Sequence, residues 1–278
     1  MRLKRLILAS STAFFAMSSA AFAAKPTEGG YWLQEAATPV MEELIWLHNF
    51  VSWIILGITI FVTVLMGYIM YRFSAKRNPV PSKTTHHVGL EVAWTIIPVI
   101  ILLVMVVPSM RLLYFQDKLP ETEMTIKVVG NTWNWEYVYP DFENVESFIS
   151  NPLEKEDAEA AGVPYLLATD APLVVPVDTK VKVLVTSSNN LHSFAMPAFG
   201  VKMDAVPGRI NETWFQVLPG KEGTYYGQCS EICGIKHYKM PIEIKVVGKD
   251  EFKQWVANDG AFTTTVASVG GGMTAAQK

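Results

Sequence analysis

The sequence is poor in charge and in cysteine, and it lacks the signature motifs of several large enzyme classes. Charged residues make up only 18% of the 278 residues, below the roughly 25% of an average soluble chain, whereas apolar residues make up 50%. The formal net charge of -3 leaves no basic field for a polyphosphate, so nucleic acid is not an expected partner. The chain contains no GxGxxG, Walker, HExxH or GxSxG motif, which gives no support to a nucleotide-dependent enzyme or a zinc or serine hydrolase. The low charge and high apolar content indicate instead that part of the chain lies in lipid.

The first residues indicate a signal peptide. A basic start with Arg2, Lys4 and Arg5 is followed by an apolar stretch and by a small-x-small sequence at residues 21–23. A first membrane helix is the alternative, but this apolar stretch is shorter than the ~20 residues that span a bilayer. We therefore expect residues 1–23 to be removed, so that the mature chain begins near Ala24 and residues 24–49 lie outside the cytoplasm.

Two longer apolar stretches, residues 50–71 and 92–113, each predict a transmembrane helix. The segment between them, residues 72–91, carries basic residues and no acidic residue before Glu91: Arg72, Lys76, Arg77 and Lys83. By the positive-inside rule this loop faces the cytoplasm, so both ends of the hairpin face outward. Glu91, at the cytoplasmic mouth of the second helix, is either an interfacial anchor or the entrance of a proton path in a partner. Its position alone favours the anchor.

The following part of the chain has the alternating pattern of β-strands. Apolar and polar residues alternate in short segments separated by Pro, Gly, Asp and Asn: residues 125–129, 173–177, 180–185, 213–217 and 242–246. This pattern predicts a β-sandwich or a Greek-key barrel over residues 114–257, which is long enough for one core. Residues 258–278 are rich in Gly, Ala, Ser and Thr, and we expect them to be disordered.

An acidic insertion interrupts this domain. Residues 141–160 contain seven acidic residues and one lysine, and Asp170 and Asp178 follow nearby. Such a segment either steers a basic protein partner toward the domain or is a solvated loop. Charge alone does not choose between these two interpretations.

The two cysteines of the chain lie in a segment rich in metal ligands. Cys229 and Cys233 are followed by His237 and Met240 within one loop between strands. Outside the cytoplasm, a cysteine pair taken alone favours a disulfide. Soft sulfur donors beside an imidazole, however, select copper, and Cys, His and a weak Met are the ligands of blue-copper sites. His192, directly after a predicted strand, offers the second imidazole that such a site needs.

Three interpretations of these residues stay open at this point. A mononuclear blue-copper carrier would use Cys233, His237, Met240 and His192 and would leave Cys229 spare. A metal-free assembly or binding module would join the two cysteines in a disulfide. The presence of two cysteines favours two metal ions bridged by both thiolates, because such a pair shares one unpaired electron and suits electron transfer.

These features together resemble subunit II of cytochrome c oxidase. They are the pattern Cys229-x3-Cys233-x3-His237-x2-Met240, His192 upstream of it, the sequence Asp-Ala-Val-Pro-Gly-Arg-Ile-Asn at residues 204–211, the aromatic cluster at residues 133–135 and the helical hairpin. The resemblance implies a cupredoxin domain that holds the binuclear copper centre CuA. Quinol oxidase subunits share the fold and the hairpin but lack the copper ligands.

The resemblance also implies a function and a location. The chain would be a subunit of a proton-pumping oxidase in a bacterial inner membrane, with its N-terminus and its copper domain in the periplasm. It would accept electrons from cytochrome c and pass them to the haem of subunit I, where oxygen is reduced. No Cys-x-x-Cys-His motif occurs in this chain, so no haem is expected on it.

Matching positions imply a role for individual residues. The copper ligands would be the side chains of five residues and one main-chain carbonyl: His192, Cys229, Cys233, His237 and Met240, with the carbonyl of Glu231. The Glu231 carboxylate would bind a magnesium or manganese ion shared with subunit I.

The resemblance implies further roles away from the copper. Trp133 would receive the electron, since Trp133 and Trp135 point to one face of a strand and an exposed ring can serve as a port. Arg209 would lie on the route to haem, and Glu91 would stand at the entrance of a proton path, which reverses the preference for an anchor. We expect the acids Asp170 and Asp178 to help dock cytochrome c. The sequence departs from the family pattern at Thr132, Asn134, Val138 and Asn190.

Overall fold

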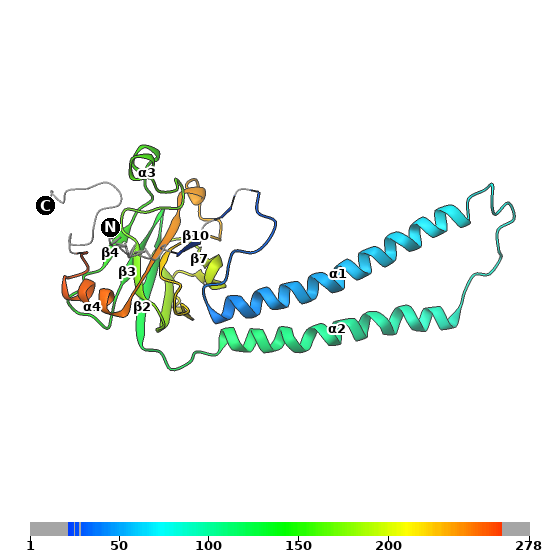
Figure 1. The fold of residues 1–278 in the computed structure, drawn as a ribbon, viewed down its shortest axis with the longest axis horizontal. Coiled ribbons are helices and arrows are strands. Elements are labelled where there is room, and N and C mark those ends of the chain that lie inside the picture. The colour runs from blue at the N-terminus through cyan, green and yellow to red at the C-terminus, as the bar shows by residue number, and fades with distance from the viewer. Residues whose placement is uncertain (1–21, 25, 28, 263–278) are drawn as a thin grey trace, which may run out of the picture.

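The computed structural model describes residues 22–24, 26–27 and 29–262, in which a long helical hairpin leads into a two-sheet β domain (Figure 1). The predicted signal peptide lies outside the described residues, except that Phe22–Ala24 form the short strand β1 beside β10, Gly223–Cys229. The predicted tail lies outside them beyond residue 262. Removal of the first and disorder of the second therefore stay predictions.

The hairpin consists of α1, Pro39–Arg72, and α2, Val88–Asp117. Both helices are long and apolar enough to cross a membrane, and the most apolar window of each is not buried in the protein. α1 begins at a cap, because Thr38 Oγ1 accepts a hydrogen bond from Met41 N–H (3.1 Å). Both helices extend past the predicted spans, since hydropathy marks only the part in hydrocarbon whereas a helix continues into the interface.

The base of the hairpin is fastened to the β domain. Ala37 N–H donates a hydrogen bond to the Ala198 carbonyl (2.9 Å), and the Thr38 hydroxyl donates one to the Phe199 carbonyl (2.7 Å). Ala37 and Thr38 are fully buried. The cap that starts α1 is therefore also a joint between the hairpin and the domain.

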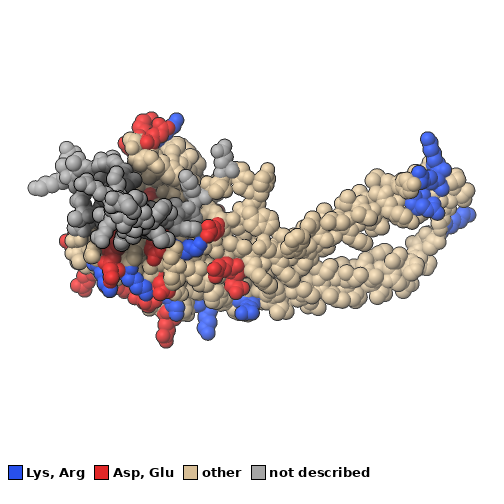
Figure 2. Space-filling view, in the orientation of Figure 1, with Lys and Arg blue, Asp and Glu red and all other residues tan. Residues whose placement is uncertain are grey.

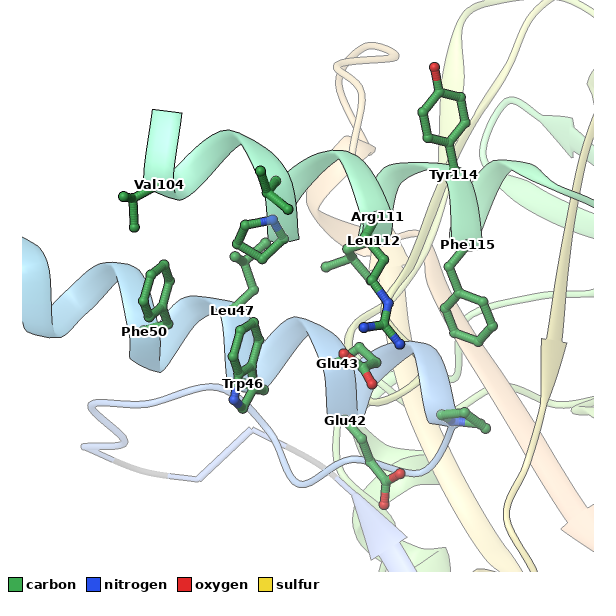
Figure 3. A pocket seen from close by; sticks show the side chains of 13 residues that line it. Glu42, Glu43, Trp46, Leu47, Phe50, Val104, Arg111, Leu112, Tyr114 and Phe115 are labelled. Carbon is green, nitrogen blue, oxygen red and sulfur yellow. The ribbon is translucent and has the colours of Figure 1, made fainter. Parts of the chain in front are cut away.

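Next to this joint the two helices leave a groove of about 960 Å³ between them. Figure 3 shows Arg111 of α2 reaching toward Glu43 of α1, with the apolar side chains of Phe50 and Val104 further along the helices. The groove is charged near the domain and apolar away from it, as expected where a hairpin leaves the membrane interface.

Two sheets form the β domain. One sheet has the order β5-β11-β10-β7-β8, with β1 beside β10, and the other has the order β4-β3-β2-β6-β9. The bounds in the first sheet are β5 Leu173–Pro176, β7 His192–Met196, β8 Val201–Ala205, β10 Gly223–Cys229 and β11 Pro241–Val247. Those in the second are β2 Met124–Asn131, β3 Asn134–Val138, β4 Phe148–Ser150, β6 Lys180–Ser187 and β9 Asn211–Gln216. Short helices complete the domain: α3 Lys155–Ala161, α4 Lys249–Ala257, and the 3₁₀ turns η1 Pro197–Phe199 and η2 His237–Lys239.

The predicted fold class, a β-sandwich behind a helical hairpin, is confirmed. Each of the five alternating segments overlaps a strand, namely β2, β5, β6, β9 and β11 in that order. β2 and β6 pair in parallel, and every second residue of each is buried between the sheets. This strand pair ends at Asn131 and Ser187, close to the start of β7, where His192 lies against Gly130 of β2.

Candidate metal centre

The two cysteines are buried and free, and they face each other at the end of β10. Cys229 is the last residue of β10 and Cys233 lies in the loop that follows. Their sulfur atoms are 3.9 Å apart, far beyond the ~2.05 Å of a disulfide bond. Cys229 N–H donates to the Met240 carbonyl (3.0 Å), which closes the loop at its base. The structure therefore shows two thiols in contact and not the disulfide that a cysteine pair alone suggests.

His192 joins the cysteines from the neighbouring strand. It is the first residue of β7, which pairs with β10 so that Phe194 lies opposite Cys229. His192 Nδ1 is 3.8 Å from Cys229 Sγ, and the ligand atoms of His192, Cys229 and Cys233 all lie within 4.8 Å of one another. Strand pairing thus brings the predicted distant imidazole to the sulfur pair.

The His192 ring is held in a closely packed seat. It contacts the Trp135 ring at a centroid distance of 6.0 Å, and its Nε2 lies 3.4 Å from Asn189 Oδ1. A Cβ atom at Gly130 of β2 would stand only 3.0 Å from His192 Cδ2, so glycine leaves the room that the ring fills. Burial, and to a lesser extent the charge of His237, lowers the pKa of His192. The ring is therefore neutral at pH 7 and keeps a lone pair for a metal.

The other predicted ligands surround the same sulfur pair. His237 Nδ1 is 3.5 Å and Met240 Sδ is 3.9 Å from Cys233 Sγ, while the Glu231 carbonyl oxygen is 3.3 Å from Cys229 Sγ. Cys229, Cys233 and Met240 are buried, and His237 and Glu231 are half-buried. All six groups that the sequence predicts as copper ligands therefore converge on one place.

The donor set fits copper better than other metals. A structural zinc site is closed by four ligands, whereas this loop and β7 gather two thiols, two imidazoles, a thioether and a carbonyl. Thiolate, imidazole and thioether together are the donors that proteins offer to copper. Six donors around a sulfur pair suit two ions bridged by the sulfurs better than one ion.

The protonation of the two thiols depends on whether a cation is bound between them. Burial, and then the proximity of Cys229, raises the pKa of the Cys233 thiol to about 12. Two thiolates side by side are unfavourable without a positive charge between them, and a bound metal ion reverses that balance. Copper binding would therefore release protons from this pair.

Trp133 lies against the cysteine loop and not on a strand. It precedes β3, so the expectation that Trp133 and Trp135 share a strand face is not met: Trp135 is fully buried in the core. The half-buried Trp133 donates a hydrogen bond from Nε1 to the Cys233 carbonyl (3.2 Å). A Cβ at Gly234 would stand 3.1 Å from its ring. The indole is thus in direct contact with the candidate metal loop.

Arg209 lies in the exposed turn after β8, and the Thr186 hydroxyl donates a hydrogen bond to its carbonyl (2.8 Å). A β-bridge between Ser187 and Pro207 ties this turn to the end of β6 beside the candidate centre. Glu91 lies in the first turn of α2, where its Oε1 accepts a hydrogen bond from His87 N–H (3.3 Å). The start of α2 lies at the end of the hairpin far from the β domain (Figure 1), so Glu91 is distant from the cysteines after β10.

The structure separates the two candidate docking acids. Asp170 accepts hydrogen bonds from Asn151 N–H (2.7 Å) and Nδ2 (3.1 Å), and Asn151 in turn contacts Asn134, the neighbour of Trp133. Asp178 precedes β6, roughly 26 Å along that strand from its metal end, and accepts a hydrogen bond from Gln216 Nε2 (2.9 Å). Only Asp170 lies near the candidate centre, so the two do not form one patch.

Two residues of the site could not be predicted from the sequence. Gly130 matters for the space it leaves, and Asn189 matters for its contact with His192. Neither has a motif in a single sequence. Only the strand register places Gly130 over a histidine that lies far away along the chain.

The chain is similar to known proteins over most of its length. Residues 124–247 match the family described as cytochrome c oxidase subunit II, periplasmic domain, and residues 26–112 match its transmembrane domain. A probable cytochrome c oxidase subunit 2 of Rickettsia felis is 48% identical over 248 residues, which cover 88% of this chain and 76% of the relative. Cytochrome c oxidase subunit 2 of Cereibacter sphaeroides is 41% identical, over 95% of this chain and 91% of the relative. The crystal structure of the periplasmic domain of subunit II of cytochrome oxidase of Bradyrhizobium japonicum is 45% identical, with a TM-score of 0.46, over 51% of this chain and 96% of that one.

Proposed function

The chain belongs to the cytochrome c oxidase subunit II family, and from this premise we propose that it is the electron-accepting subunit of that oxidase. It is a membrane protein and a subunit of a haem-copper oxidase complex. Within that complex it would take single electrons from cytochrome c at a binuclear copper centre and pass them to haem in subunit I. Oxygen reduction then belongs to subunit I, and this chain would carry no haem.

The proposal depends above all on the contact between the two free thiols, Cys229 and Cys233, which the other possible copper ligands surround. His192, Cys229, Cys233, His237 and Met240 would hold the copper pair through their side chains, and Glu231 through its carbonyl. When bound, the pair would share one unpaired electron across both ions, so that little has to move as an electron arrives or leaves. The side chain of Glu231 would bind a magnesium or manganese ion at the border with subunit I.

The residues around the site support electron transfer in three ways. Burial of His192, both cysteines and Met240 would exclude water from bound copper. Attachment of His192 to β7, Cys229 to β10 and His237 to η2 would keep these ligands in position. The Trp133 indole is hydrogen-bonded to the Cys233 carbonyl and would offer an electron from cytochrome c a short path to the centre. Arg209 would lie on the onward route to haem.

We propose a bacterial inner membrane as the location, with the copper domain in the periplasm. Figure 2 shows Lys and Arg side chains gathered at the far end of the hairpin, while most acidic side chains lie on the β domain. The positive-inside rule then places the loop between α1 and α2 in the cytoplasm. Glu91, near this loop, would stand at the entrance of a proton path in subunit I.

Replacement of Cys229 or Cys233 by serine tests the copper centre. We expect each variant to insert its hairpin normally but to lose the binuclear copper signal in electron paramagnetic resonance, together with electron transfer from cytochrome c. Wild type should bind two copper ions per chain and show hyperfine splitting from two equivalent nuclei. One copper per chain would favour a mononuclear carrier, and a chain without copper or free thiols would favour a disulfide module. A normal spectrum in either serine variant would contradict the proposal.

A further inference from the structure

The acidic insertion, residues 141–160, contacts the metal loop, which we define as residues 230–240. Figure 2 shows acidic side chains gathered over α3, which lies at the upper edge of the domain in Figure 1. Glu154, directly before α3, forms an ion pair with Lys239 (Oε2–Nζ 2.6 Å). Further along, the Leu166 carbonyl accepts a hydrogen bond from the side chain of Gln228, the residue before Cys229 (3.3 Å).

Lys239 lies in the metal loop beside two of the candidate ligands. It is the last residue of η2, so it stands between the candidate ligands His237 and Met240. Its side chain is only 12% exposed, whereas that of Glu154 is 67% exposed. A lysine withdrawn from water needs a partner for its charge. Among the described residues, Glu154 is the one acid within ion-pair distance of Lys239.

The Lys239 ammonium and the Glu154 carboxylate approach to 2.6 Å, the distance of a charge-assisted hydrogen bond. The contact joins two segments that are far apart in the sequence: the insertion and the turn that presents His237 and Met240.

We propose that Glu154 is a positioning residue for the metal centre, because with Lys239 it fixes the turn that carries His237 and Met240 and cancels the lysine charge beside the metal. This inference rests on the proposed copper function. It assigns to the insertion a role inside the subunit, apart from any role in docking. It also predicts that the two partners affect the redox potential of the centre in opposite directions.

The sign of each effect follows from charge. An oxidised one-electron centre carries one more positive charge than the reduced centre. Glu154→Gln leaves the Lys239 cation uncompensated, which disfavours the oxidised state and raises the midpoint potential. Lys239→Met leaves the Glu154 carboxylate, which favours the oxidised state and lowers the midpoint potential. The double variant removes both charges and should return the potential close to that of wild type.

The test uses purified oxidase that contains the full chain, with Glu156→Gln as the matched control. Glu156 lies on α3, and its side chain forms no ion pair or hydrogen bond within the part of the chain that the structure describes. Its variant makes the same change of charge two residues away. The readouts are the midpoint potential and the paramagnetic hyperfine pattern of the copper, and the rate at which a chelator removes it.

We expect opposite shifts in the two single variants, recovery in the double variant and no shift in the control. The chelator should remove copper about threefold faster from Glu154→Gln than from wild type, as loss of one partly exposed ion pair predicts. Equal shifts in Glu154→Gln and Glu156→Gln, or shifts of one sign in both single variants, would overturn the inference. If Lys239→Met does not fold, the comparison of the two glutamine variants still decides. Wild-type oxidase without a copper pair in this chain would refute the copper function instead.

Discussion

Replacing Gly130 by alanine tests whether close packing against β2 fixes the position of the His192 ring. The added methyl would stand 3.0 Å from Cδ2, 3.1 Å from Cγ and 3.2 Å from Cβ of His192, closer than ordinary van der Waals contact. The ring has little room to retreat, because His192 is fully buried and touches Trp135 and Asn189. A shift of a few tenths of an ångström in a packed interior costs ~1–3 kcal/mol. We expect Gly130→Ala to lower the unfolding free energy of the chain by about that amount.

The same shift should be visible at the metal. We expect a changed hyperfine pattern in the copper-loaded variant, since His192 is one of the proposed ligands, and a lower melting temperature in the metal-free chain. Gly67→Ala is the matched control, because a Cβ at this exposed helical glycine meets nothing within 4 Å. Unchanged stability together with an unchanged spectrum in Gly130→Ala would refute the argument that β2 fixes the imidazole.

Three further changes give separate tests. Burial raises the pKa of Glu243 above its ordinary value of 4.5. The protonated side chain therefore stabilises the fold below pH 4.5, and this stabilisation is lost as the pH rises through the higher pKa of the folded state. Glu243→Gln should raise the melting temperature at pH 7 but not at pH 4. Trp133→Leu should slow electron transfer from cytochrome c in stopped-flow measurements while copper content stays normal, and unchanged kinetics would remove its role. Thr38→Val should lose a helix cap and a buried bond to Phe199, at a cost of ~1–2 kcal/mol in thermal unfolding; an unchanged melting curve would show that this joint does not hold the hairpin.

The sequence pattern works best for the two long strands that have one face in the core, β2 and β6. β2 and β6 alternate strictly between buried and partly exposed residues, which is the pattern that periodicity detects. β7 escapes because its five buried residues neither alternate in polarity nor form an apolar run like that of β5: it begins with the polar residues His192 and Ser193. β4 has only three residues, too few for a pattern. Periodicity thus reveals the sandwich but not the strand that carries His192.

Much of the candidate site is predictable because its residues are close together in sequence. Cys229, Cys233, His237 and Met240 share one loop, so their spacing alone suggests a metal site. Contacts that depend on register are not predictable in this way. The ion pair of Glu154 and Lys239 joins two segments whose meeting is decided by the packing of the insertion against η2.

The contact between the two thiols also bears on the choice between a metal site and a disulfide. Sulfur atoms 3.9 Å apart can share metal ions, and a modest movement would bring them to the ~2.05 Å of a covalent bond. Oxidation proceeds through the thiolate, and burial raises the pKa of the Cys233 thiol to about 12, which lowers the thiolate fraction of that residue in the metal-free site. The same burial that would exclude water from a bound metal therefore disfavours attack by the Cys233 sulfur. Copper requires reduced thiols, so the free pair is the state that would load metal.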